Sequence, residues 1–175
     1  MDHDYSGDYE LAWHFLTDGG GYPVMRDGAR LTVGKWYEHT GVLQMCAAGY
    51  HASSLALHAL EYAPGPWVSL VEVDGTIERG DDKLVCTRRR ALWAYDATEQ
   101  LRLFARNCAL DVADLWEMPA IVREYLETGR EDIRDAASAA ARDAAWAAAA
   151  RAAARAAAWD HQNATLESLL IGGCP

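Results

Sequence analysis

The C-terminal third of the chain is dominated by alanine, and no glycine or proline occurs between residues 131 and 171. Alanine has the highest helix propensity of all residues, whereas glycine and proline interrupt helices. The sequence therefore predicts one long helix over residues 131–171, which ends at Gly172. Because this helix presents small side chains, it must lie against another part of the chain or against a partner protein. Trp146 and Trp159 interrupt the alanines, and we expect them to anchor the helix.

The N-terminal half of the chain has the pattern of a β-sheet. In the segment 67–73, Val68 and Glu72 belong to one face and Val71 to the other, as in a strand. The Asp74-Gly75 pair that follows is typical of a hairpin turn. Other apolar segments predict four more strands and one short helix, which are strands 11–16, 31–37, 42–46 and 82–92 and helix 55–62.

Helical signals replace strand signals after residue 95. Asp96 and Glu99 have the spacing of a capping box, and Pro119 and Gly129 suit the start and the end of a further helix. We therefore predict an α+β fold, with a small mixed or antiparallel sheet followed by helices. The predicted organisation is a sheet domain over residues 1–95 and a helical region over 96–175 that packs on it, the two forming one cooperative unit.

Charge and cysteine content narrow the classes of partner. The net charge of −10 disfavours extensive contact with a nucleic-acid backbone, which requires clustered lysine and arginine. One basic cluster lies in the predicted strand 82–92, where alternation should divide its charges between two faces. No two of the four cysteines form a CxxC pair, so we predict no metal site.

The sequence also lacks the signals of membrane proteins and of the commonest enzyme families. No apolar run approaches the roughly 20 residues of a membrane span, and the acidic N-terminus is unlike a secretory signal. We therefore predict a cytoplasmic protein with no membrane partner. The motifs GxxxxGK, GxGxxG, HExxH and GxSxG are absent from the sequence.

Four residues are candidates for catalysis. His51, between a predicted strand and a predicted helix, could bond a ribose hydroxyl or transfer protons, or it could tie a loop to the backbone. Lys83 could contact a phosphate or act as a nucleophile, or it could form a solvated ion pair. Glu72 and Asp82 could stabilise positive charge on a sugar, although alternation favours a solvated sheet face for Glu72.

Four further residues are candidates for substrate binding: Tyr50, Trp36, Lys35 and Arg88. Trp36 could stack on a base, with core packing as the commoner role of such an aromatic residue. Cys46 lies near His51 in the sequence, which suggests a thiol–imidazole pair.

Two resemblances add to these patterns. The segments AWHFLTDGG (12–20), CxxGxHA (46–52) and DKLV (82–85) resemble a family of uncharacterised domains from phage and bacterial genomes, often with alanine-rich tails. This resemblance implies a role in phage–host conflict. The segments GYHAS (49–53) and ALEYA (59–63), with the strand 67–73, are similar to part of the ADP-ribosyltransferases, which implies NAD as a substrate.

Together these observations predict an enzyme that breaks an N-glycosidic bond. It would transfer ADP-ribose from NAD, hydrolyse NAD, or remove a base from nucleic acid; no other cofactor is predicted. His51 and Tyr50 would orient the sugar or the base, Lys83 would contact a phosphate, and Glu72 or Asp82 would stabilise the developing charge. The alternative is a non-catalytic acidic interaction protein, such as an immunity or anti-defence factor, that docks through its alanine-rich helix. A cavity holding His51, Lys83 and a carboxylate would favour the enzyme.

Overall fold

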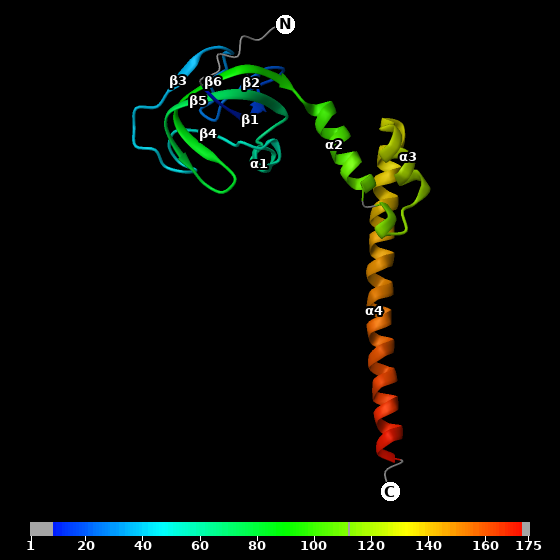
Figure 1. Ribbon diagram of the computed structural model, residues 1–175. Coiled ribbons are helices and arrows are strands. Elements are labelled where there is room, and N and C mark those ends of the chain that lie inside the picture. The colour runs from blue at the N-terminus through cyan, green and yellow to red at the C-terminus, as the bar shows by residue number, and fades with distance from the viewer. Residues whose placement is uncertain (1–8, 112, 173–175) are drawn as a thin grey trace. The chain divides into compact units, whose positions relative to one another are not determined.

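The computed structural model describes residues 9–111 and 113–172, with the side chains of residue 115 and residues 155–172 outside that description. The chain divides into two compact units, residues 1–101 and 102–175, and each is described by itself. Figure 1 gives the order of the elements along the chain. The packing of the helical region on the sheet domain stays a prediction.

The first unit is built on an antiparallel sheet. The long strands β5 (Trp67–Arg79) and β6 (Leu84–Asp96) form a hairpin, and β1 (Glu10–Asp18) pairs with the other edge of β5. Within the described residues, three short strands complete the sheet: β2 (Pro23–Val24) on β1, and β3 (Trp36–Glu38) and β4 (Tyr50–Ala52) on β6. The predicted α+β class is confirmed, and every strand pair of this sheet is antiparallel.

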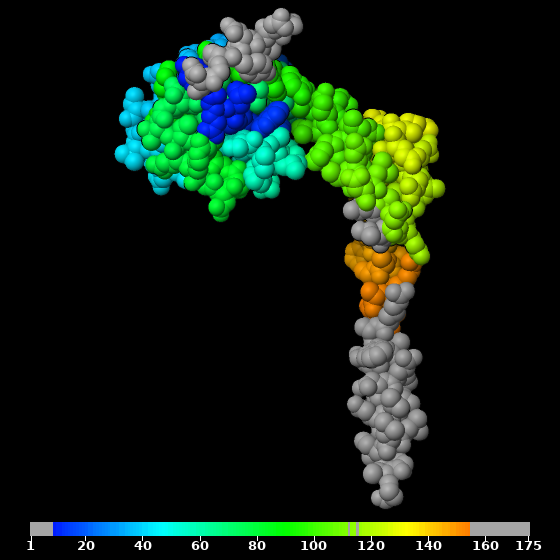
Figure 2. Space-filling view, viewed as in Figure 1, coloured from blue at the N-terminus to red at the C-terminus, as the bar shows by residue number. Residues whose placement is uncertain are grey.

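A short helix covers part of β1. Helix α1 (Ala56–Glu61) lies against this strand (Figures 1 and 2), and its Ala59 packs with Phe15 in a small apolar cluster. The helix predicted over residues 55–62 is therefore confirmed to within a residue at each end.

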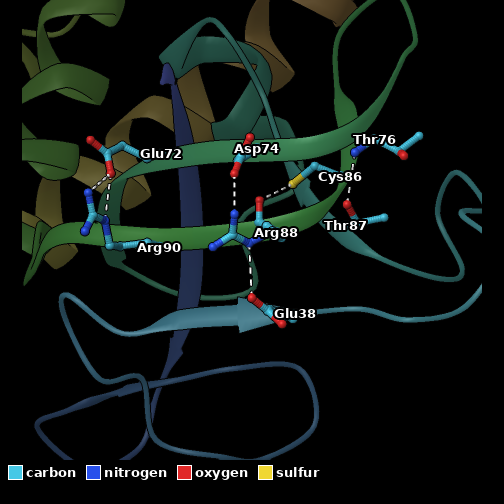
Figure 3. Close-up of polar contacts among 8 residues, drawn as sticks. All are labelled: Glu38, Glu72, Asp74, Thr76, Cys86, Thr87, Arg88 and Arg90. Atoms are coloured by element: carbon cyan, nitrogen blue, oxygen red, sulfur yellow. Dashed lines mark hydrogen bonds and ion pairs between the residues drawn. The ribbon is translucent and has the colours of Figure 1, made fainter. Parts of the chain in front are cut away.

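The hairpin turn predicted at Asp74-Gly75 is wrong, because β5 continues through it to Arg79. The strand is irregular there, with a shift of register between Asp74 and Ile77. Gly75 has a φ of +78°, and a Cβ added to it would lie 2.2 Å from Oγ1 of Thr87. The backbone N–H of Thr76 donates a hydrogen bond to the same oxygen at 3.0 Å (Figure 3). The Asp-Gly pair thus forms a bulge, and the chain reverses at residues 80–83, where Gly80 N–H bonds the Lys83 carbonyl at 2.8 Å.

Two further predicted strands differ from the structure. In place of the strand predicted over 42–46, residues 44–48 form a tight turn, in which the carbonyl of Gln44 accepts hydrogen bonds from the N–H groups of Ala47 and Ala48. Cys46 in this turn has a φ of 66°, a left-handed conformation that a strand does not contain. The strand predicted over 31–37 is reduced to β3, because the chain turns at Gly34 with a φ of +81°.

The two faces of the sheet differ in character. The inner face, which carries Val71, Val73 and Arg89, packs on the main apolar core. The outer face pairs acidic side chains of β5 with arginines of β6, Glu72 with Arg90 and Asp74 with Arg88 (Figure 3). The predicted division of the basic cluster between two faces is therefore confirmed.

The second unit is helical. The structure confirms the long C-terminal helix as α4 (Arg134–Gly172), preceded by α2 (Thr98–Asp111), which starts in the first unit, and by α3 (Ala120–Thr128). Gly129 ends α3 in the left-handed conformation, as predicted. Trp146 is 75% exposed within the helical unit, so the prediction that it anchors α4 against another part of the chain or a partner stays a prediction; Trp159 lies outside the described side chains. Among the described residues, no helix combines the length and the apolar character needed to cross a membrane.

Candidate functional site

A cavity of about 830 Å³ opens on the inner face of the sheet. Its walls come from β1, β4, the middle of β6, Lys83 just before β6, the turn after β2, the turn around Cys46, and the region of α1. It therefore lies within the first unit and draws on segments that are far apart in the sequence. Both its size and its mixture of aromatic and charged walls are typical of small-molecule sites.

Arg89 is the most deeply buried charged group on the cavity wall. Its side chain is only 6% exposed, and it donates a hydrogen bond to the backbone carbonyl of His51. In the part of the chain that the structure describes, no carboxylate forms an ion pair with it. Burial therefore lowers the pKa of Arg89 to about 10, from an ordinary value above 12. A buried guanidinium without an acidic partner is costly, and an anion in the cavity would offset that cost.

Lys83 provides a second cationic group. Its Nζ lies 3.9 Å from the centre of the Tyr62 ring, and a hydrogen bond with Tyr62 raises the pKa of Lys83. The Tyr62 hydroxyl in turn donates to Asp82, which lowers the pKa of that carboxyl. A raised pKa keeps the ammonium protonated, so the geometry suits Lys83 to binding an anion rather than to nucleophilic attack.

His51 lines the same cavity, but backbone groups hold its ring. Its Nε2 accepts a hydrogen bond of 2.8 Å from the backbone N–H of Cys46, and the ring also bonds the backbone of Gly49. Burial and the charge of Arg89 lower the pKa of His51, so the ring is neutral at pH 7. This geometry matches the loop-tying role that the sequence left open for His51. The backbone N–H of Cys46 makes this contact with the ring, and the Cys46 thiol is a hydrogen-bond partner of Lys83.

The cavity wall carries the carboxylate of Asp27, a residue that no sequence pattern indicated. It lies in the turn after β2, where its Oδ1 accepts a hydrogen bond of 3.0 Å from the Ala29 N–H. Asp82 lines a smaller neighbouring hollow of about 240 Å³, which also includes Lys83.

Glu72 lies on the outer face, away from the cavity lining. It is 1% exposed, so the solvated position favoured for it by alternation is wrong. The guanidinium of Arg90 pairs with its carboxylate, with Nε to Oε2 at 2.7 Å. Because the ring of Trp36 lies 4.9 Å from that guanidinium, it helps to cover the pair.

Of the predicted binding residues, Tyr50 lines the cavity, whereas Trp36, Lys35 and Arg88 lie outside its lining. Arg88 on the outer face is bound by Asp74 at 2.5 Å and by Glu38 at 3.1 Å (Figure 3). Lys35 is exposed just before β3, with its Nζ 5.2 Å from the Tyr37 ring. The structure thus brings together His51, Tyr50 and Lys83 of the predicted set.

Two other cavity residues were missed, and one signal could have found them. His14 and Arg89 both occupy inward positions of amphipathic strands, where a charged or titratable residue interrupts an apolar face. Such an interruption marks either a buried ion pair or a ligand site. Among the described residues, no group of three or more His, Cys, Asp or Glu side chains is arranged to hold a metal ion.

Comparison with known proteins finds one similarity, which covers part of the chain. Residues 23–103 match the model of a domain of unknown function, DUF7666. The match includes Asp27, His51, Lys83 and Arg89 but not β1. No curated protein and no solved structure gave a match. An uncharacterised domain family was expected from the sequence, and no comparison supports the resemblance to ADP-ribosyltransferases.

Proposed function

We propose that the cavity of the first unit binds a nucleotide. The observation that carries this proposal is the buried guanidinium of Arg89, which faces the cavity without a carboxylate partner among the described residues. Phosphate groups are the usual partners of arginine in such sites, because the guanidinium donates several hydrogen bonds in one plane.

The charge of the cavity supports an anionic ligand. The chain as a whole carries a net charge of −10, yet three cationic side chains line the cavity with one carboxylate, namely Arg26, Lys83 and Arg89 with Asp27. A local excess of positive charge in an acidic protein attracts small anions and does little to attract a long nucleic-acid backbone.

The aromatic walls suit the remainder of a nucleotide. Tyr50 and Tyr62 contribute aromatic side chains to the lining, whereas Trp13 and Phe15 alternate with His14 along β1 and pack in the apolar cluster of Ala59. Aromatic side chains bind flat rings by stacking, so a base can lie against one of these walls while its phosphates approach Arg89 and Lys83.

Cleavage of the N-glycosidic bond is the reaction that we propose for the bound nucleotide. In this step the bond between the sugar carbon and the base nitrogen breaks, the electron pair leaves with the base, and water adds to the sugar carbon. The Asp27 carboxylate would stabilise the positive sugar carbon and accept the proton of the water, a role that the sequence assigned to Glu72 or Asp82. A function in phage–host conflict stays a prediction.

Isothermal titration calorimetry with NAD, ADP-ribose and AMP tests the binding. Arg89→Met should weaken binding about tenfold to a hundredfold, because a charged hydrogen bond is lost. Arg88→Met is the matched control, since the neighbouring residue of the same strand lies on the outer face, and it should leave the affinity unchanged. Absence of binding by the unaltered protein, or equal losses in both variants, would contradict the proposal.

Chromatography of the same mixtures tests the reaction separately. Release of a free base from NAD by the unaltered protein, and not by Asp27→Asn, would support cleavage, provided that Asp27→Asn still binds the nucleotide. Binding without release of any base would leave a nucleotide-binding domain and end the catalytic part of the proposal. If no nucleotide binds at all, the non-catalytic acidic interaction protein becomes the better description.

A further inference from the structure

Among the residues that the structure describes, the imidazole of His14 lines this cavity without a hydrogen bond to either ring nitrogen. His14 lies near the middle of β1 and lines the cavity on the inner face. Its backbone carbonyl accepts a hydrogen bond from the Ser69 hydroxyl at 3.0 Å. Across residues 9–111 and 113–172, no hydrogen bond joins its ring to another group. A histidine ring in a folded interior ordinarily finds a partner for at least one nitrogen, so the ring of His14 has its bonding capacity available to a ligand.

The charges around His14 are predominantly positive. Arg89 of β6 and His51 of β4 are the neighbours whose charges act on it. The other titratable and charged groups around the same cavity are Arg26 and Asp27 from the turn after β2, Cys46 from the tight turn, Tyr50 from β4, Tyr62 after α1, and Lys83 at the hairpin. Burial, the charge of Arg89 and, where it is protonated, that of His51 hold the pKa of His14 well below its usual range, so the ring is neutral at pH 7.

From this arrangement we propose that His14 and Arg89 together hold the anionic group of the ligand, and that His14 takes up a proton as the anion binds. The inference rests on the proposed function. It identifies the residues that form the anion subsite and states how pH controls the affinity of that subsite. Burial and the charge of Arg89 keep His14 deprotonated; an anion beside Arg89 offsets the second of these causes, and its own negative charge stabilises the protonated ring. The ring then gains a proton and donates a hydrogen bond to the anion. Proton uptake and anion binding strengthen each other, because the coupling between two binding events is reciprocal.

His51 does not take this role, although it lies beside the same guanidinium. Its Nε2 already accepts the N–H of Cys46, so protonation at that nitrogen would break a structural hydrogen bond. His14 has no such bond to lose. The backbone hydrogen bond to Nε2 of His51 therefore distinguishes the two histidines of the cavity.

The test uses two probes, inorganic sulfate and ADP-ribose, because their charges stay constant between about pH 5.5 and pH 7.5. Any change of affinity over this range then belongs to the protein. Calorimetry in buffers of different ionisation enthalpy gives the number of protons taken up on binding. For the unaltered protein we expect tighter binding as the pH falls, by up to about tenfold per pH unit, with uptake of up to one proton.

His14→Gln should bind both probes with an affinity that no longer depends on pH and without proton uptake. His14→Asn is a second variant in case glutamine is not tolerated, and thermal unfolding at neutral pH shows whether each variant is folded. His39→Gln is the matched control, because His39 lies outside the cavity lining and should keep the full pH dependence.

Binding of either probe with a constant affinity and no proton uptake would overturn this inference and leave the proposed function intact. A pH dependence that persists in His14→Gln would also overturn it. If neither probe binds at any pH, the inference and the proposed function fail together.

Discussion

The backbone N–H of Cys46 donates a hydrogen bond of 2.8 Å to Nε2 of His51, and this bond closes the tight turn that borders the cavity. Cys46 adopts a left-handed conformation there, with a φ of 66°. A non-glycine residue is strained in that conformation, so the bond to His51 helps to hold the turn in place. The histidine that the sequence presents as a catalytic candidate thus acts first on the shape of the cavity wall.

Replacing His51 with alanine should therefore reduce stability before it affects any chemistry. The N–H of Cys46 loses its acceptor, and we expect the free energy of unfolding to fall by about 1 kcal/mol, the usual contribution of one hydrogen bond. Urea unfolding of His51→Ala against the unaltered protein measures the change. His39→Ala removes an imidazole with only a weak contact, at 3.4 Å to the Val42 carbonyl, and should cost less. Equal costs would contradict the role given to His51.

The bulge in β5 predicts a difference between two glycines of similar conformation. Gly75 and Gly34 have φ values of +78° and +81°, but only at Gly75 would an added Cβ meet another atom within 4 Å, Oγ1 of Thr87 at 2.2 Å. Gly34→Ala should cost about 1 kcal/mol for its backbone conformation alone. Gly75→Ala should cost about 1–3 kcal/mol more, because the added methyl group displaces Thr87. Thermal or urea unfolding of the two variants tests this ranking, and similar stabilities would show that the bulge readjusts freely.

The ion pairs of the outer face should contribute unequally to stability. Glu72 is 1% exposed and pairs with Arg90, whereas the side chain of Glu38 is 62% exposed and pairs with Arg88. Glu72→Gln leaves a partly buried guanidinium without its counter-charge, which should cost about 3 kcal/mol. Glu38→Gln breaks an exposed pair and should cost less than about 1 kcal/mol. Both values come from urea unfolding, and a small loss in Glu72→Gln would mean that water replaces the carboxylate.

The lowered pKa of His14 predicts how stability changes with pH. In the unfolded chain the ring titrates near its ordinary value of about 6.5, and in the folded chain it stays neutral to lower pH. Below about pH 6.5 the unfolded state therefore binds a proton at His14 that the folded state does not bind. The contribution of His14 to the free energy of unfolding is complete above that pH and is lost as the pH falls. The loss from this group is at most about 1.4 kcal/mol per pH unit.

Urea unfolding at pH 7.5 and pH 5.5 measures this loss. The difference between the two pH values should be smaller in His14→Gln than in the unaltered protein. His51 contributes a loss of the same sign, because burial and Arg89 lower its pKa too, so part of the dependence should persist in the variant. An identical pH dependence in both proteins would show that His14 titrates normally in the folded state.

The sequence by itself was sufficient for the elements whose causes are local. The alanine-rich run predicts α4 because helix propensity adds up along adjacent residues. Gly129 predicts the end of α3 because glycine, which has no Cβ, adopts the left-handed conformation of a helix end without steric cost. Alternation along β6 likewise predicts that Arg89 separates from Arg88 and Arg90. These features depend on neighbours within a few positions in the chain.

The tertiary structure decided the features that depend on pairing between distant residues. Asp74-Gly75 has the local signal of a turn, yet the hydrogen bonds of a long β5–β6 ladder extend the strand through it as a bulge. Glu72 has the alternation of a solvated residue, yet Arg90 covers it from the next strand. The cavity combines His14 of β1, Asp27 of a turn and Arg89 of β6, because antiparallel pairing and chain reversal bring segments about 75 residues apart to one face of one sheet. Propensity and periodicity act along the chain, whereas the site is formed by contacts across it.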